Sequence, residues 1–134
     1  MELRLDKIKS GISFEMEKIV QAEDSAIRYD SGLVDVFATP AMVALMEGTS
    51  YRCVMDLLSE GYSTVGTEIN IRHLKATPLG MKVRCKSLLT LSDGKRLVFE
   101  VKAWDENGLI GEGTHERFIV DTQKFLARLK GDNL

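Results

Sequence analysis

A threonine, a glutamate and a histidine are the side chains of this sequence best suited to chemistry. Thr39 precedes Pro40, and Glu47 follows the apolar segment 41–46, while His73 is one of only two histidines. A carboxylate among apolar residues needs a partner or shifts its pKa, and a histidine titrates near neutral pH. Together with a hydroxyl, these groups could perform general acid–base or nucleophilic hydrolysis.

The same residues also have structural explanations. His73 could be a hydrogen-bonded histidine at a strand end, and Glu47 could pair with Arg72 or a surface lysine. On one helix, Thr39 and Glu47 are separated by roughly 12 Å of rise and about 80° of rotation. For the three to act as a unit, His73 must lie between them, or residues of two protomers must converge.

The segment that begins at Thr39 predicts a long helix. Thr39 is a typical helix N-cap, and proline is favoured at the first helical position. The helix is expected to run from Pro40 to about Glu60, with Gly61 just past its end. Because residues 41–46 are apolar on every side, the helix should be buried on all sides.

The rest of the chain shows the alternation of strands. One strand is predicted before the helix and four after it, joined by hairpins, of which the last two have Asp-Gly and Asn-Gly turn signals. Polar residues 21–35 predict a loop that could fold over a site. The predicted strands are 13–20, 64–74, 81–91, 95–104 and 109–120, and a terminal helix is predicted at 121–130.

This element order predicts an α+β domain in which a curved antiparallel sheet of about five strands wraps a long central helix, the hotdog architecture. No repeat or linker interrupts the chain, so residues 1–134 should form a single domain. Such a sheet leaves edges and a helix-free face uncovered, and we therefore expect a homodimer or a tetramer.

Composition argues against several classes of protein. With 18 basic and 20 acidic residues and a net charge of −2, the chain has no nucleic-acid-binding signature. Its longest apolar run is about six residues, far below the roughly 20 of a membrane span. No signal-peptide core is present, so a cytoplasmic location is expected. Cys53 and Cys85 are too few for a disulfide framework or a zinc site, and no metal or cofactor is predicted.

Strict alternation assigns the strand at 64–74 two faces. One face is apolar and is expected to place His73 on the same side of the sheet as Glu47. The other face carries Gly66. The predicted helix-facing residues are Val65, Thr67, Ile69, Ile71 and His73, and the opposite residues are Gly66, Glu68, Asn70 and Arg72.

Several blocks of the sequence resemble the fluoroacetyl-CoA thioesterase family, in the same order and spacing from about residue 13 to 128. The most specific are His-x-x-Ala-Thr-Pro-x-Gly at 73–80 and Gly-Thr-His-Glu-Arg at 113–117. The others are Val-Phe-Ala-Thr at 36–39, Met-Val-Ala-Leu-Met-Glu at 42–47 and Ser-Thr-Val-Gly-Thr at 63–67. The resemblance implies a hotdog fold and hydrolysis of an acyl-CoA.

By this resemblance, Thr39, Glu47 and His73 correspond to the family's catalytic threonine, glutamate and histidine. Gly66 corresponds to a glycine whose backbone lines the acyl pocket, and Arg117 to an arginine near the acyl group. Because glycine lacks a side chain, the Gly66 N–H could approach a thioester carbonyl as an oxyanion donor. A sheet bulge or close packing would also explain this glycine.

The strand that carries Arg117 is not cleanly amphipathic, which indicates two covered faces or a bulge. Arg117 and His115 share one face by alternation. Arg117 could form a surface ion pair or contact the acyl group or a CoA phosphate, whereas His115 is more readily explained as structural.

The loop before Thr39 departs from the family pattern. The fluoroacetyl-specific enzyme has aromatic lid residues just before its Val-Phe-Ala segment, whereas residues 30–35 here contain none. Leu33 and Val34 are the apolar residues of this loop that could cover the site. Leu33 and Phe37 are predicted to contact the acyl group. Selectivity for fluorine is therefore not implied.

We therefore predict an acyl-CoA thioesterase acting on a short or modest acyl group. His73 would be the general base or would activate Thr39, and Glu47 would orient and stabilise His73 or act as the base itself. An acyl-threonine intermediate and direct attack by water are both compatible with these residues. A non-catalytic acyl-CoA-binding hotdog module is the alternative, and a hotdog hydratase is disfavoured because no Asp–His pair follows the helix start.

Overall fold

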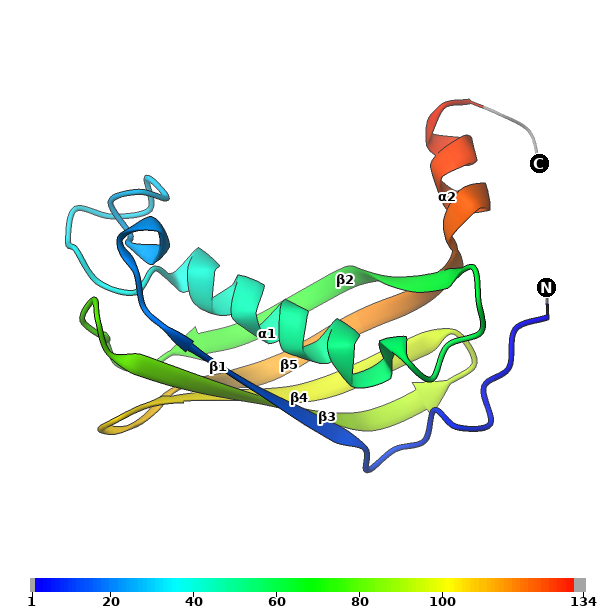
Figure 1. The fold of residues 1–134 in the computed structure, drawn as a ribbon, viewed down its shortest axis with the longest axis horizontal. Helices are drawn as coiled ribbons and strands as arrows, with labels where there is room; N and C mark the ends of the chain where they lie inside the picture. The colour runs from blue at the N-terminus through cyan, green and yellow to red at the C-terminus, as the bar shows by residue number, and fades with distance from the viewer. Residues whose placement is uncertain (1, 132–134) are drawn as a thin grey trace.

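Helix α1 (Thr39–Met55) lies across one face of a five-stranded antiparallel sheet (Figure 1). The computed structural model describes residues 2–131. The sheet order is β1-β3-β4-β5-β2, so β1 and β2 are the edge strands. This is the α+β arrangement that the sequence predicts. The other elements are β1 (Ser13–Ile19), the short 3-10 helix η1 (Ala22–Asp24), β2 (Tyr62–His73), β3 (Lys82–Asp93), β4 (Arg96–Asp105), β5 (Gly108–Asp121) and α2 (Thr122–Leu129).

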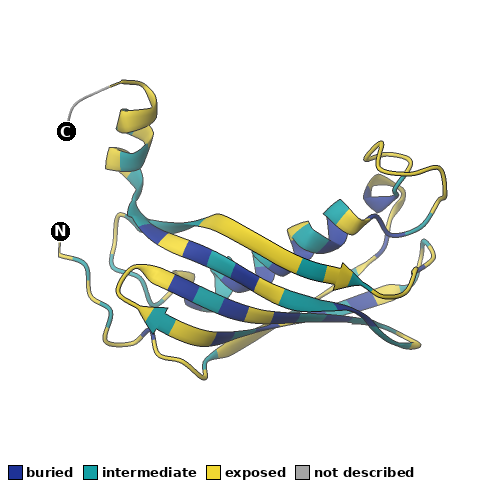
Figure 2. Cartoon of the chain, turned by 180° about the vertical axis from the view of Figure 1, so that it is seen from behind, coloured by how far each residue is buried: buried dark blue, intermediate teal, exposed yellow. Residues whose placement is uncertain are grey.

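The hydrophobic core fills the space between α1 and the sheet. Residues along β3 and β4 alternate between buried and intermediate or exposed, as the colours in Figure 2 show from behind the sheet. Each large apolar side chain buried in this way contributes about 1.5–3 kcal/mol to folding. The core includes Met42, Leu45, Met46 and Val54 of α1 and Val83, Cys85, Leu89, Leu97, Phe99 and Val101 of β3 and β4.

Helix α1 differs from its sequence prediction in two respects. It ends at Met55 rather than near Glu60, because the following residues turn back toward β2, with Leu57 N–H donating to the Val54 carbonyl over 2.9 Å. The prediction that α1 is buried on all sides is also wrong. The sheet covers one flank, so Ala44 on the other flank is exposed.

The connection from β2 to β3 is not a hairpin, in contrast to the prediction. β2 pairs with β5, and the chain crosses past the start of α1 to reach β3. Phe37 N–H donates to the Thr77 carbonyl over 2.8 Å, which ties this crossover to the loop before α1. The crossover therefore places the end of β2 beside the N-terminus of α1. The β3–β4 and β4–β5 connections are the predicted hairpins, with Gly94 and Gly108 at positive φ.

A β-bulge in β2 changes which residues face the helix. The register shifts between Gly66 and Glu68, so Thr67 has no opposite residue on β5. One extra residue reverses the alternation of faces, and Gly66 and His73 therefore both face α1. The prediction that Val65 and Thr67 share a face with His73, opposite Gly66, is wrong for this reason.

A second bulge explains the irregular alternation of β5. Ala103 of β4 lies opposite Gly111, whereas the next residue, Trp104, lies opposite Leu109. Ile110 is the extra residue and is fully buried. Of the two explanations that the sequence left open, the bulge is thus present.

Candidate active site

Thr39 and His73 form a hydrogen-bonded pair where β2 ends beside the start of α1. Thr39 Oγ1 lies 2.7 Å from His73 Nδ1. Thr39 is the first residue of α1 and Ala38 is the N-cap, so the prediction that Thr39 caps the helix is wrong. The Thr39 hydroxyl engages the imidazole instead, because the crossover after β2 brings His73 within hydrogen-bonding distance.

The environment of His73 favours its neutral form. Burial lowers the pKa of the imidazole, and the backbone of Lys75 partly offsets this effect. Among residues 2–131, His73 Nε2 is the buried side-chain polar atom that lacks a hydrogen-bond partner. A neutral imidazole with Nδ1 at the Thr39 hydroxyl can accept its proton as a general base.

This pair lines a cavity of about 310 Å³ between the loop before α1 and the end of β2. Phe37 also lines the cavity, although its side chain is fully buried. Leu33 is 96% exposed and is not one of the lining residues, so its contact with an acyl group stays a prediction. The lining residues are Ala26, Ser31, Val36, Phe37, Ala38, Thr39, His73, Leu74, Lys75 and Ala76.

Glu47 belongs to a second cluster, farther along α1. Its Oε2 lies 4.0 Å from Arg117 Nη1, and its side chain is 42% exposed. The prediction of a carboxylate buried within the helix is therefore wrong for this chain. A Cβ at Gly66 would lie 2.9 Å from Glu47 Oε2 and 3.4 Å from Arg117 Nη1. Close packing and the bulge account for glycine at this position, and its role as an oxyanion donor stays a prediction.

Arg117 is held firmly on the helix-facing side of β5. Its Nε donates to Thr64 Oγ1 over 2.7 Å and its Nη2 to the Thr64 carbonyl over 2.9 Å. Its Nη1 lies 3.1 Å from His115 Nε2. Burial lowers the pKa of Arg117, with Glu47 and Tyr51 opposing the shift, and an arginine still stays charged at neutral pH. At 7% exposure, Arg117 is a buried cation and not a surface residue.

Within one chain, the three predicted catalytic residues therefore lie in two clusters. Thr39 and His73 form one, and Glu47 packs with Gly66 and Arg117 in the other. Across the described part of the chain, no hydrogen bond or ion pair joins Glu47 to Thr39 or His73. The geometric separation that the sequence indicated along α1 is thus retained in the fold.

Two residues of the second cluster were not selected from the sequence. His115 was assigned a structural role, and Thr64 was not considered, yet both hold Arg117. The alternation of β5, which puts His115 and Arg117 on one face, was the available signal for His115. Thr64 could not be selected, because strict alternation places it away from the helix, whereas the β2 bulge puts it on the same side as His73.

The two cysteines and the possible metal ligands are further candidates for chemistry in this chain. Cys53 and Cys85 are free, and burial raises the pKa of Cys85 to about 11, so its thiol stays protonated at neutral pH. Among residues 2–131, no group of three or more His, Cys, Asp or Glu side chains could hold a metal ion. None of the described helices has the length and apolarity to cross a membrane.

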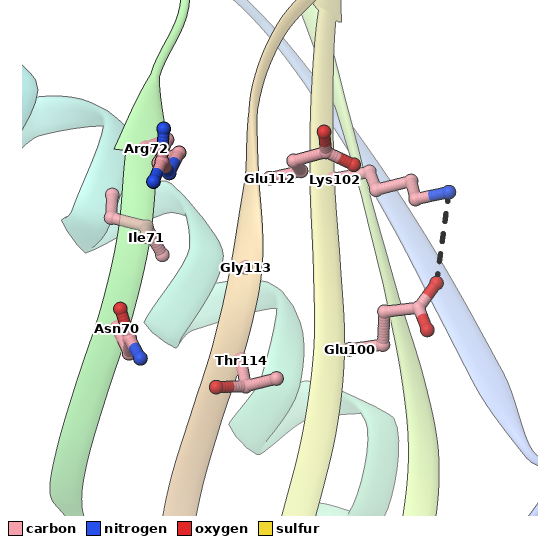
Figure 3. A pocket seen from close by; sticks show the side chains of 8 residues that line it. All are labelled: Asn70, Ile71, Arg72, Glu100, Lys102, Glu112, Gly113 and Thr114. Atoms are coloured by element: carbon pink, nitrogen blue, oxygen red, sulfur yellow. Dashed lines mark ion pairs between the residues drawn. The ribbon is translucent and has the colours of Figure 1, made fainter.

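The helix-free face of the sheet carries a separate hollow of about 450 Å³ (Figure 3). Its charged residues are two cations, Arg72 and Lys102, and two anions, Glu100 and Glu112. Lys102 Nζ lies 3.7 Å from Glu100 Oε1. Because the charges balance and none of the predicted catalytic side chains lines this hollow, the candidate chemistry lies on the helix side.

One helix packed against five antiparallel strands is the arrangement of a hotdog fold, and a threonine–histidine pair lies at the start of that helix. The chain belongs to the fluoroacetyl-CoA-specific thioesterase family, whose model matches residues 20–123. A fluoroacetyl-CoA thioesterase from Streptantibioticus cattleyicolor is 40% identical over 96 residues, which cover 72% of this chain and 69% of that protein.

Solved structures agree with this assignment. The fluoroacetyl-CoA thioesterase FlK superposes with a TM-score of 0.88 at 32% identity, covering 96% of this chain and 100% of FlK. A phenylalanine-to-alanine variant of FlK in complex with fluoroacetate and CoA has a TM-score of 0.83 at 33% identity, covering 88% and 99%. A hot-dog-like protein from Thermanaerovibrio acidaminovorans, at 24% identity and a TM-score of 0.87 over 95% and 94%, supports the fold alone. The predicted hotdog fold is confirmed.

Proposed function

We propose that this protein hydrolyses short acyl-CoA thioesters to the free acid and CoA. The observation that carries the proposal is the 2.7 Å contact between Thr39 Oγ1 and His73 Nδ1 beside a cavity. Membership of a thioesterase family supports it, as does the FlK variant that binds fluoroacetate and CoA. A thiol-release assay over a panel of acyl-CoAs tests it. Binding of acyl-CoA without release of CoA would instead indicate a non-catalytic binding module.

Two routes fit the proposed site. In the first, His73 takes the Thr39 proton as the hydroxyl oxygen attacks the thioester carbonyl, and the C–S bond breaks to give acyl-Thr39 and CoA. Water then hydrolyses the ester. In the second, His73 or Glu47 deprotonates a water molecule that attacks the carbonyl directly. In both, the Gly66 N–H would stabilise the oxyanion and Arg117 would lie near the acyl group.

The active form is proposed to be a homodimer in which the two clusters meet. β2 is an edge strand of 12 residues, and it carries both Gly66 and His73. If two β2 edges pair antiparallel around Asn70, His73 of one protomer lies opposite the partner's Thr67, the bulge residue next to Gly66. One site would then combine Thr39 and His73 with the partner's Glu47, which explains two clusters in one chain.

Light scattering should therefore report a dimer or a tetramer at micromolar concentration, because an exposed β2 edge favours pairing. Co-expression of His73→Ala and Glu47→Gln chains tests the composite site. Half of the dimers are then mixed and hold one intact site, so about a quarter of wild-type turnover should return. A stable, fully active monomer would contradict the dimer, and mixed dimers without activity would contradict the shared site.

Selectivity for fluorine should be weak. The loop at 30–35 has no aromatic residue, and Leu33 and Val34 are 96% and 63% exposed. Discrimination of one small substituent without a dedicated polar contact is worth about 1–3 kcal/mol. We therefore expect kcat/KM for fluoroacetyl-CoA to exceed that for acetyl-CoA by no more than roughly 100-fold. Longer or branched acyl groups should be accepted comparably.

Steady-state kinetics with fluoroacetyl-, acetyl- and butyryl-CoA measure this selectivity. Leu33→Phe is the matched variant, because it restores an aromatic side chain to the loop and should increase the preference for the fluorinated substrate. A wild-type preference of several thousand-fold would show that the lid argument is wrong. The cytoplasmic location expected from the sequence remains a prediction.

A further inference from the structure

We infer that His115 is a positioning residue that fixes the Arg117 guanidinium toward Gly66 and Glu47. His115 lies on β5, two residues before Arg117, with its side chain 1% exposed. In the described part of the chain, no hydrogen bond joins it to Thr39 or His73, and one joins it to Arg117, so a role would be exerted through Arg117. The inference rests on the proposed function, in which Arg117 lies near the acyl group.

The hydrogen bonds of His115 select one tautomer. Nδ1 lies 2.8 Å from the Glu68 carbonyl oxygen, which can only accept, so Nδ1 carries the proton. Nε2 is then a lone-pair acceptor for Arg117 Nη1, 3.1 Å away. The ring also stacks on Phe99, with centroids 6.4 Å apart. A buried ring held on both nitrogens cannot turn without losing a hydrogen bond.

This acceptor completes the support of Arg117. Because the guanidinium is a rigid plane, the two bonds to Thr64, at Nε and Nη2, leave it one motion, a rotation of the whole plane about the line that joins these bonds, which displaces Nη1. The bond to His115 holds Nη1, which then lies 4.0 Å from Glu47 Oε2 and 3.4 Å from the Cβ position of Gly66. Nη1 is thus aimed at the place proposed for the thioester carbonyl.

The arrangement requires a neutral His115. Burial lowers the pKa of its imidazole, the bond to the Glu68 backbone and the charge of Glu47 raise it, and the charge of Arg117 lowers it. Among the described residues, the charged and titratable groups packed against His115 and Arg117 include Glu47 and Tyr51 of α1, and Arg52 in turn stacks on Tyr51. Protonation of Nε2 would set two N–H donors and two positive charges 3.1 Å apart. Arg117 would then lose its third support.

Two substitutions separate the hydrogen bonds of His115. His115→Gln can present an acceptor near the position of Nε2, whereas His115→Asn retains only a donor toward Glu68. We expect His115→Gln to keep kcat within about fivefold of wild type, and His115→Asn to lower it about ten- to hundredfold with little change in KM, as for a lost hydrogen bond to a charged group. Thr114→Asn, on the solvent face of β5, is the control and should change neither parameter.

The reverse order would overturn the inference. If His115 mainly supports the β2 bulge through Glu68, His115→Asn should be the more active variant, and activity should follow the melting temperature. In an Arg117→Met background, His115→Asn should lower kcat little further, because both changes remove the same support. Full additivity of the two losses would also contradict positioning through Arg117.

The tautomer can be tested without turnover. Nitrogen-15 NMR of the imidazole at pH 7 should show the proton on Nδ1 of His115 and a lone pair on Nε2. A proton on Nε2 would overturn the inference. If the wild-type protein releases no thiol from any acyl-CoA, the proposed function fails, while the tautomer still decides whether His115 accepts from Arg117.

Discussion

Replacing His73 with alanine should lower kcat/KM for acyl-CoA thioesters by roughly 100-fold or more, the usual effect of losing an acid–base group. The imidazole is hydrogen-bonded to Thr39 over 2.7 Å and lies at the end of β2, so its removal takes away the proton acceptor and leaves the core intact. Thiol-release kinetics and a melting curve measure the two effects. Near-wild-type turnover would make His73 a structural residue.

The pH profile provides a second test of His73. Because burial lowers its pKa from the ordinary value of 6.5, the neutral imidazole persists below that pH. Wild-type kcat/KM should therefore fall only when the pH drops below 6.5. The fall should follow the lowered pKa of His73, because the imidazole is then protonated and can no longer act as a base. The pKa of His115 is lowered as well. His115→Gln should therefore retain the acid limb that comes from His73, whereas the residual activity of His73→Ala in the His115→Gln background should lack it.

Replacing Glu47 with glutamine should abolish most of the activity, by roughly 100-fold or more, with the fold preserved. Glutamine keeps the volume and removes the charge that would stabilise the His73 imidazolium or act as the base. The stability change should be small, because the Glu47 carboxylate is 42% exposed and lies 4.0 Å from the buried Arg117 guanidinium, so that solvent screens the pair. In the variant, Arg117 keeps its contacts with Thr64 and His115.

Glu100→Gln is the matched control for Glu47→Gln. It removes the charge of a similarly exposed carboxylate, which is 49% exposed and lies 3.7 Å from the exposed Lys102, on the opposite face of the sheet. Both variants should melt close to the wild type, and only Glu47→Gln should lose turnover. A large fall in the melting temperature of Glu47→Gln with activity intact would instead identify Glu47 as a structural partner of Arg117.

Local patterns were sufficient to predict the elements of this fold. Alternation and turn residues predicted the five strands and the hairpins at Gly94 and Gly108. The terminal helix is also present, and it begins at Thr122, one residue later than predicted, with Asp121 as its N-cap. These features depend on residues close together in the chain, whose spacing alone specifies period and turn type. The hydroxyl, carboxylate and imidazole of the candidate site were also visible in the sequence, because they are unusual in their surroundings.

The grouping of those side chains was decided by tertiary structure. Strict alternation separated Gly66 from His73, and the bulge at Thr67 put both on the helix side, since one extra residue reverses the faces. Glu47 was expected to be buried because its neighbours are apolar, but exposure depends on what covers a helix, and the sheet covers only one flank.

The contacts that assemble the candidate site join residues far apart in the chain. The crossover after β2, and no local pattern, brings His73 to Thr39. The pairing of β5 with β2 similarly places His115 and Arg117 beside Gly66. The sequence by itself therefore determined the elements, the fold class and the reactive residue types. Only the folded chain decided which of these residues meet, because strand register and helix cover arise from packing between distant segments.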